Sequence, residues 1–229
     1  MPYEIYSPCA RRVAGVLFDM DGVVLDTEKL YARFWQEAAI ALGYPMTWQQ
    51  ALGMRSRSRQ AGQAQLDLYF GPGVSHAALR EKRIELMDAY IAEHGVEAKP
   101  GIHALLDRLD ELGIPKAIAT SSPMERICRY LEPLGLLTRF DALCTGYDVP
   151  HGKPAPDIYL HAAAAIGVAP EMCLALEDSP AGVQSAVSAG CRCVLIPDQD
   201  QPDEATRCLL YGRADSLDDV ILLLEGECL

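Results

Sequence analysis

Polar side chains that could bind a charged ligand follow four apolar stretches of the sequence, at the point where each stretch ends. The first is FDMDGVVLDT, in which Asp19 and Asp21 follow the apolar residues 13–18. The others are KAIATSS, the segment GYDVPHGKPAPD that follows DALCT, and CLALED. Together they contribute carboxylates, hydroxyls and one ammonium group: Asp19, Asp21, Thr120, Ser121, Ser122, Lys153, Glu177 and Asp178.

This set of groups indicates a magnesium site that also binds phosphate. Several carboxylates cannot remain ionised side by side unless a positive charge offsets their repulsion. A hard divalent cation with oxygen ligands does so, and Mg²⁺ is the usual choice where phosphate is bound. Lys153 and the hydroxyls suit a phosphoryl group. The polar positions include no cysteine and only one histidine, His151, which disfavours zinc or iron.

These side chains can meet only if the stretches that carry them are strands of one sheet. From Gly101 onward, predicted strands and helices alternate, which is typical of parallel strands with helices on both faces. The sequence therefore predicts an α/β fold with a Rossmann-like, doubly wound parallel sheet, in which ligands bind beyond the carboxyl ends of the strands. The expected strands are residues 13–18, 116–120, 141–145, 173–177 and 193–196, and the expected helices 102–112, 157–166, 181–189 and 217–225.

A helical insert interrupts this alternation. Residues 27–94 show apolar side chains at three- and four-residue spacing without β-branched runs, and EAKPG breaks the pattern. We therefore expect a core domain formed by residues 1–26 and 98–229, and a helical domain formed by residues 27–97.

Charge and composition limit the possible partners and the compartment. The formal net charge of −12 argues against binding to nucleic acid or to an anionic membrane surface. No apolar run reaches membrane-spanning length, and MPYEIYSPCARR lacks the apolar centre of a signal peptide. The eight cysteines are scattered without a CxxC pair, so we expect reduced thiols and a cytoplasmic protein.

The motifs resemble those of the haloacid dehalogenase superfamily, in particular its β-phosphoglucomutase-like phosphohydrolases with a helical cap of the C1 type. The strings DMDGVVLDT, ATSS, GKPAPD and LEDSPAGVQSA occur in the order that this family shows. The resemblance extends over the whole core, from Val13 to about Ile196. It implies a Mg²⁺-dependent phosphatase that acts on a small phosphorylated metabolite, such as a sugar, polyol or nucleotide-type phosphomonoester.

The same resemblance implies a role for each carboxylate. Asp19 would be the nucleophile that forms an aspartyl-phosphate, and Asp21 the general acid and base. Asp19, the main-chain carbonyl of Asp21 and Asp178 would ligate Mg²⁺. Glu177 would either ligate the metal directly or support a ligand.

The hydroxyls and cations would bind the substrate. Thr120 and Lys153 would hold phosphate oxygens, Lys153 would also temper the charge of the nucleophile, and Ser121 and Ser122 would contribute through the adjoining backbone. In the insert, Arg55 and Arg57 could grip an anionic part of the substrate, or could equally be solvated side chains paired with nearby acids.

Several of these residues have a structural alternative. Asp26 or Thr27 is expected to cap the first helix of the insert. One of the serines before Pro123 could cap the helix that follows, and EDS at 177–179 could also be a capping sequence.

The resemblance leaves a choice between a phosphatase and a sugar phosphomutase. Sugar mutases of this group carry a histidine early in the first cap helix, where this sequence has Tyr31, and a lysine where it has Pro123. Both differences favour hydrolysis. A receiver-like regulatory domain is a third possibility, but it needs neither Asp21 nor an insert of about 70 residues. The natural substrate and the choice between monomer and homodimer stay open.

Overall fold

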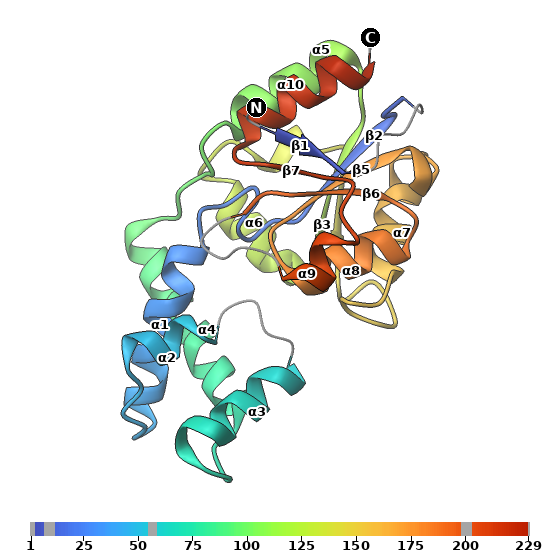
Figure 1. Ribbon diagram of the computed structural model, residues 1–229. Coiled ribbons are helices and arrows are strands. Elements are labelled where there is room, and N and C mark those ends of the chain that lie inside the picture. Colours follow the sequence, from blue (N-terminus) through green and yellow to red (C-terminus); the bar gives the residue numbers. More distant parts are fainter. Residues whose placement is uncertain (1–2, 7–11, 55–58, 198–202, 229) are drawn as a thin grey trace. The chain divides into compact units, whose positions relative to one another are not determined.

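The chain forms two compact units. The computed structural model describes residues 3–6, 12–54, 59–197 and 203–228 (Figure 1). Contacts group Met1–Asp26 with Glu97–Leu229 into one unit and Thr27–Val96 into the other. We call the first the α/β unit and the second the helical unit.

Within the described residues, the α/β unit is built on one seven-stranded sheet with the order β1-β7-β6-β5-β2-β3-β4. All neighbouring strands are parallel except β1 and β7, which are antiparallel. The predicted doubly wound α/β fold is confirmed, with one antiparallel strand added at the edge. The strands are β1 (Tyr3–Ile5), β2 (Gly15–Phe18), β3 (Lys116–Thr120), β4 (Ala142–Thr145), β5 (Cys173–Glu177), β6 (Arg192–Leu195) and β7 (Gly212–Ala214).

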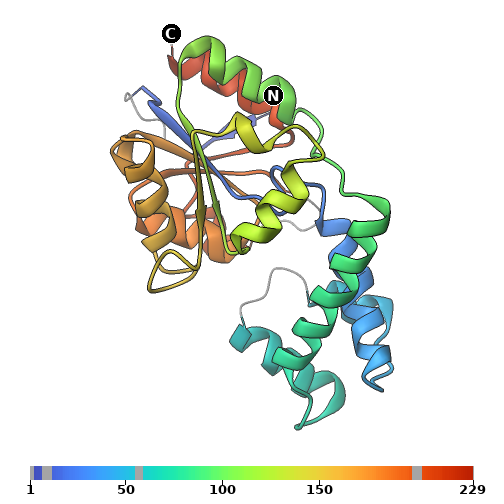
Figure 2. The same cartoon turned by 180° about the vertical axis from the view of Figure 1, so that it is seen from behind.

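Helices cover both faces of this sheet. In the two opposite views, α5 and α10 lie side by side on one face, and α7 and α8 lie on the other (Figures 1 and 2). The central strands β2, β3 and β5 are buried at every position, as expected for strands packed on both sides. The helices are α5 (Ile102–Leu112), α6 (Met124–Leu131), α7 (Asp157–Ala165), α8 (Pro180–Ser188), α9 (Glu204–Arg207) and α10 (Leu217–Cys228), with short 3₁₀ helices at Leu137–Arg139 and Pro170–Met172.

The edge strands β1 and β7 were not predicted from the sequence. Each has three residues, too few to show an alternating pattern. Their pairing depends on a close approach, because a Cβ atom at Gly212 would lie 2.6 Å from the carbonyl oxygen of Glu4. The predicted elements 102–112, 116–120 and 173–177 have the observed bounds, and the other predicted elements differ from the observed ones by one to three residues at an end.

The helical unit has a small apolar core of its own. Its helices are α1 (Glu28–Ala41), α2 (Trp48–Leu52), α3 (Arg59–Phe70) and α4 (His76–His94). The buried core residues include Trp35, Met54, Leu66 and Leu79. Thr47 starts α2 with a capping box, and Ser75 caps α4 by accepting a hydrogen bond from Ala78.

The start of α1 differs from the sequence-based expectation. Thr27 occupies the N-cap position, but its side chain makes no capping hydrogen bond. The Thr27 side chain is fully buried, and its carbonyl accepts hydrogen bonds from Leu30 and Tyr31. The prediction that the Thr27 side chain caps this helix is therefore wrong, and the alternative that Asp26 does so stays a prediction.

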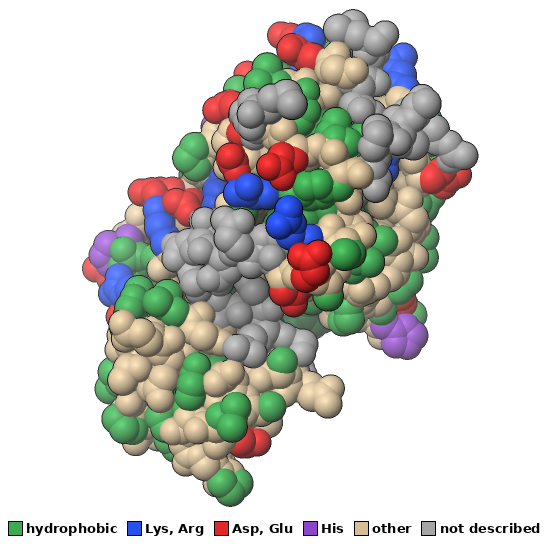
Figure 3. All heavy atoms as spheres, in the orientation of Figure 1, with side chains coloured by type: hydrophobic (Ala, Val, Ile, Leu, Met, Phe, Trp, Pro, Cys, Tyr) green, Lys and Arg blue, Asp and Glu red, His purple; other side chains and the backbone are tan. Residues whose placement is uncertain are grey.

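Surface charge and helix length give two further observations. On the face drawn in Figure 3, acidic and basic side chains of the described residues are interspersed with apolar and uncharged ones. Among the helices in the described part of the chain, none combines the length and apolar character needed to cross a membrane.

Candidate active site

The loop after β2 presents Asp19 and Asp21 at the carboxyl end of the central strand. The amide of Asp19 still donates to the carbonyl of Leu176 in the adjacent strand, at 3.0 Å. The chain then turns sharply, and Gly22 adopts a φ of +87° that other residues rarely adopt. Because of this turn, the carboxylates of Asp19 and Asp21 both stay at the carboxyl end of β2.

Lys153 reaches this strand end from the loop between β4 and α7. Its Nζ lies 2.5 Å from Oδ1 of Asp19 and 2.5 Å from Oε1 of Glu177. The side chain is 8% exposed, so the ammonium sits between two carboxylates with little access to water. The predicted position of Lys153 beside Asp19 is therefore observed, and a solvated surface position is excluded.

Asp178 completes a group of carboxylates that could hold a cation. Asp19, Glu177 and Asp178 each offer an oxygen, and these oxygens lie within 4.8 Å of one another. Gly22 makes room for this arrangement, because a Cβ atom there would lie 2.1 Å from Oδ2 of Asp178. Three hard oxygen ligands at this spacing fit a divalent cation such as Mg²⁺.

The hydroxyl residues after β3 have different environments. Thr120 is buried, and its Oγ1 accepts a hydrogen bond from the amide of Ser122 at 3.1 Å. The Ser122 hydroxyl lies 3.2 Å from Oδ2 of Asp21, to which it donates, whereas Ser121 is exposed. The N-cap position of α6 is Pro123, without a side-chain capping bond, so the alternative that a serine caps α6 is not observed.

Ser179 caps a helix, as the structural alternative for EDS at 177–179 predicts. The Ser179 side chain accepts a hydrogen bond from the amide of Gly182 at 3.2 Å and thereby caps α8. The same hydroxyl lies 3.1 Å from Oε2 of Glu177. One residue therefore joins the start of α8 to the carboxylate at the end of β5.

The electrostatics of the site reflect burial and crowding. The pKa of Asp19 is raised to about 8, mainly by burial and also by the charges of Glu177 and Asp21, although the charge of Lys153 acts in the opposite direction. Burial by itself lowers the pKa of Lys153, but the charges of Asp19 and Glu177 outweigh it, so that the pKa is raised. Lys153 is thus firmly protonated, and a bound cation would shift Asp19 toward its ionised form.

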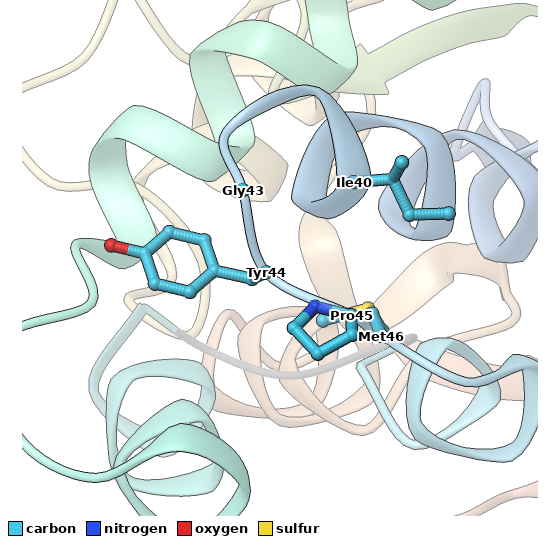
Figure 4. A pocket seen from close by; sticks show the side chains of 5 residues that line it. All are labelled: Ile40, Gly43, Tyr44, Pro45 and Met46. Carbon is cyan, nitrogen blue, oxygen red and sulfur yellow. The ribbon is translucent and has the colours of Figure 1, made fainter.

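Two predicted residues of the helical unit cannot be placed at this site. Arg55 and Arg57 lie outside the described residues. His151 is exposed and its Nδ1 lies 3.0 Å from Oδ1 of Asp157. Among the described residues, those that line a hollow of about 530 Å³ in the helical unit are Ile40, Gly43, Tyr44, Pro45 and Met46 (Figure 4).

Sequence reasoning missed Tyr159. This residue of α7 is fully buried, and its hydroxyl lies 2.6 Å from Oε1 of Glu177. The available signal was its place in the apolar run IYLHAAAA, because a buried tyrosine hydroxyl needs a polar partner. The identity of that partner depends on how α7 packs against the sheet.

The chain is similar to characterised hydrolases over most of its length. A family model described as haloacid dehalogenase-like hydrolase matches residues 13–190. Hexitol phosphatase A from Escherichia coli (strain K12) is 34% identical over 185 residues, which cover 81% of this chain and 83% of that protein. The phosphorylated carbohydrates phosphatase from Thermotoga maritima is 30% identical over 222 residues, covering 92% of this chain and 90% of that protein.

A solved structure extends the likeness to the fold. The crystal structure of a HAD family hydrolase from Deinococcus radiodurans R1, with bound phosphate and sodium, is 26% identical, with a TM-score of 0.76. The match covers 96% of this chain and 99% of that chain. The similarity in structure therefore includes both units of the chain.

Proposed function

Since this chain belongs to the haloacid dehalogenase-like hydrolases, we propose that it is a Mg²⁺-dependent phosphatase that hydrolyses a small phosphorylated metabolite through a covalent intermediate on Asp19. The observation that carries the proposal is the convergence of Asp19, Asp178 and Lys153 at the carboxyl ends of β2 and β5. This arrangement provides a nucleophile, a cation site and a fixed ammonium group in one place.

The proposed reaction has two displacement steps at phosphorus. A carboxylate oxygen of Asp19 attacks phosphorus, the bond from phosphorus to the ester oxygen breaks, and Asp21 donates a proton to the leaving alkoxide. In the second step Asp21 takes a proton from water, the water oxygen attacks phosphorus, and the bond to Asp19 breaks. Inorganic phosphate leaves and Asp19 regains its carboxylate.

The residues around Asp21 support its part in this scheme. The hydrogen bond from Ser122 to Oδ2 of Asp21 helps to fix the orientation of this carboxyl group. We assign Ser122 to orienting Asp21, and the hydroxyl of Thr120, the Ser121 backbone and Lys153 to phosphate oxygens. Positioning and charge neutralisation are most of what phosphoryl transfer requires.

The metal site is proposed to consist of Asp19, the main-chain carbonyl of Asp21 and Asp178. Closely spaced carboxylate oxygens fit Mg²⁺, which prefers hard oxygen ligands. When bound, Mg²⁺ neutralises negative charge on the transferred phosphoryl group. Asp178 itself contributes a second negative charge that holds the cation near the nucleophile.

The substrate class is proposed from relatives and from the domain organisation. Two relatives carry names that specify hexitol or carbohydrate phosphates, so we propose a sugar or polyol phosphate. We assign substrate selection to a cap domain formed by residues 27–97, and catalysis to a core domain formed by residues 1–26 and 98–229. Arg55 and Arg57 are candidates within that cap domain for binding a further anionic group.

Two residues favour hydrolysis over a mutase reaction. Tyr31 lies in the first turns of α1, where sugar phosphomutases of this group carry a histidine. Pro123 precedes α6, where those mutases carry a lysine. We propose a cytoplasmic location as well, because four buried cysteines in the described chain are free thiols: Cys144, Cys173, Cys191 and Cys193.

Replacement of the nucleophile tests the proposed function. We expect Asp19→Asn to abolish release of inorganic phosphate from an activated aryl phosphate in the presence of Mg²⁺, and EDTA to do the same to the unmodified protein. Asp215→Asn is the matched control, because Asp215 is exposed and pairs with Arg213. Full activity of Asp19→Asn would refute the role of Asp19.

The choice between phosphatase and mutase needs a second substrate. With β-glucose 1-phosphate, a phosphatase releases inorganic phosphate together with glucose. Accumulation of glucose 6-phosphate without free phosphate would instead establish the mutase reaction.

A further inference from the structure

Tyr159 and Lys153 share one oxygen atom of Glu177. The Tyr159 hydroxyl donates to Oε1 of Glu177 at 2.6 Å, and Nζ of Lys153 donates to the same oxygen at 2.5 Å. Tyr159 and Glu177 are both fully buried. A carboxylate oxygen has two lone-pair sites, so these two donors occupy Oε1.

The second oxygen of Glu177 is surrounded by donors from the start of α8. The hydroxyl of Ser179 lies 3.1 Å from Oε2, and the amides of Asp178 and Ser179 lie 3.2 and 3.4 Å from it. Both oxygens of Glu177 are thus committed to donors of the protein itself. A metal ion would have to displace one of these donors to bind Glu177.

The Glu177 carboxylate occupies the space beside Gly182 that a larger residue would fill. A Cβ atom at Gly182 would lie 1.9 Å from Cδ of Glu177. The side chain is therefore packed against the first turn of α8 on one side and hydrogen-bonded to Tyr159 of α7 on the other. A side chain at position 182 would displace the Glu177 carboxylate from this place.

We propose that Tyr159 is a positioning residue of the active site: it holds Glu177 as the fixed counter-ion of Lys153, so that Lys153 is aimed at Asp19 and Glu177 does not ligate the metal. This inference rests on the proposed function, because it assigns roles within the same phosphatase site. It decides between the two roles that the family resemblance leaves open for Glu177.

The physical reason lies in the competition of two carboxylates for one ammonium group. Glu177 and Asp19 each lie 2.5 Å from Nζ of Lys153. The hydrogen bond from Tyr159 polarises the Glu177 carboxylate toward the hydroxyl group. This weakens the electrostatic attraction between Glu177 and the ammonium group of Lys153. Without that hydroxyl, Lys153 would move toward Glu177 and away from the nucleophile.

The third N–H group of Lys153 lies near Tyr159, which agrees with a positioning role for Tyr159. The remaining contact of Nζ within the site is the Tyr159 oxygen at 3.4 Å, which is long for a hydrogen bond. The aromatic ring of Tyr159 also lies near the ammonium, with its centroid 5.0 Å from Nζ. Tyr159 thus limits the movement of Lys153 while leaving one donor available to a phosphate oxygen.

Tyr159→Phe tests the proposal, because it removes the hydroxyl and keeps the ring. We expect kcat for an activated aryl phosphate to fall about tenfold, with KM and the Mg²⁺ concentration for half-maximal activity unchanged within about twofold. Tyr130→Phe is the matched control at a buried tyrosine outside the site and is expected to keep the kcat of the unmodified protein.

Two kinetic outcomes would overturn the proposal. An unchanged kcat in Tyr159→Phe would show that the hydroxyl does not position Lys153. Recovery of full kcat at high Mg²⁺, with a raised half-maximal concentration, would show that Tyr159 acts through the metal and that Glu177 is a ligand.

A double-mutant cycle provides a readout that does not depend on activity. Tyr159→Phe, Lys153→Met and the double variant are compared by urea unfolding. If Tyr159 acts through the shared carboxylate, the effects of the two substitutions on stability are not additive. The unfolding equilibrium constant of the double variant then differs by more than about fivefold from the value expected from the two single variants. Additive effects would overturn the proposal.

The double-mutant cycle and the activity assays distinguish failure of the proposed phosphatase function from failure of the positioning role of Tyr159. An unmodified protein without phosphatase activity would refute the proposed function, and the unfolding cycle would still decide whether Tyr159 and Lys153 are coupled. An active protein whose Tyr159→Phe variant is equally active would refute the positioning role alone.

Discussion

The ammonium nitrogen of Lys153 lies 2.5 Å from Oδ1 of Asp19, although 134 residues separate the two in the chain. Asp19 follows β2, and Lys153 belongs to a loop that enters the site after β4. This contact places a fixed positive charge beside the carboxylate that we propose as nucleophile. It also means that the charge of each residue depends on the other.

Removing the ammonium should affect both stability and activity. In Lys153→Met, Asp19 and Glu177 would remain buried without their shared cation. We expect a loss of about 3 kcal/mol in the free energy of unfolding, as for other buried pairs that lose one partner. The kcat for an activated aryl phosphate should fall at least about 100-fold. Urea unfolding and phosphate release measure the two effects.

Lys153→Arg separates charge from position in this experiment. It keeps a positive charge, but the planar guanidinium cannot reproduce the point contact of an ammonium between two carboxylates. We expect part of the stability to return while kcat stays low. Recovery of kcat in Lys153→Arg would contradict a positional role.

The turn after Asp21 should not tolerate a side chain. Gly22 has a φ of +87°, and a Cβ atom there would lie 2.1 Å from Oδ2 of Asp178. We expect Gly22→Ala to abolish most activity, because the alanine displaces Asp178 from the carboxylate group. Backbone strain should add a loss of stability of about 1–2 kcal/mol.

Gly113→Ala is the matched control for this substitution. Gly113 also has a positive φ, at +64°, but a Cβ atom there would meet nothing within 4 Å. The control should lose about 1 kcal/mol of stability and retain activity. Equal activity losses in the two variants would show that backbone strain, not contact with Asp178, causes the defect.

Asp178 should determine metal affinity. We expect Asp178→Asn to raise the Mg²⁺ concentration for half-maximal activity at least about tenfold, because one anionic ligand becomes neutral. Mg²⁺ should also raise the Tm of the unmodified protein, by linkage of binding to folding, and raise that of Asp178→Asn much less. Thermal unfolding with and without Mg²⁺ provides the measurement, and an identical Tm shift in both proteins would exclude Asp178 as a ligand.

The raised pKa of Asp19 predicts a specific pH dependence of stability. With burial as the main cause, this pKa rises to about 8 from the ordinary aspartate value of 3.8. Between these pH values the folded protein holds a proton that the unfolded chain releases, so stability should fall as pH rises from about 4 to about 8. Asp19→Asn removes this titration.

Urea unfolding in EDTA at pH 5 and pH 8 measures this effect. The free energy of unfolding of the unmodified protein, relative to that of Asp19→Asn, should decrease between the two pH values. If the difference between the two proteins is the same at both pH values, Asp19 does not titrate with a raised pKa.

The sequence already contained the order of the main elements and most of the polar site residues. Strands such as KAIAT and CLALE are short, apolar and followed by polar residues, so both their type and their ends were predicted from local pattern. The parallel topology then follows from alternating strands and helices, and it places Asp19, Thr120 and Glu177 at one edge of the sheet.

The local sequence pattern does not predict a structural feature that depends on residues far away in the chain. The strands β1 and β7 have too few residues to be recognised alone, and their pairing needs the space that Gly212 leaves for the backbone of Glu4. Thr27 looked like a capping residue because of its place before a helix, yet the fold buries it without a capping bond. In both cases packing decided the outcome.

The sequence by itself determined which chemical groups stand at the strand ends of this protein, because residue type and strand order suffice for that. Only the tertiary structure decided how those groups share their hydrogen bonds. Tyr159 appears in the sequence as one apolar position of a helix, and Glu177 as one of two acids after a strand. The packing of α7 and α8 against the sheet turns both toward Lys153, because buried donors and acceptors must find partners within the fold.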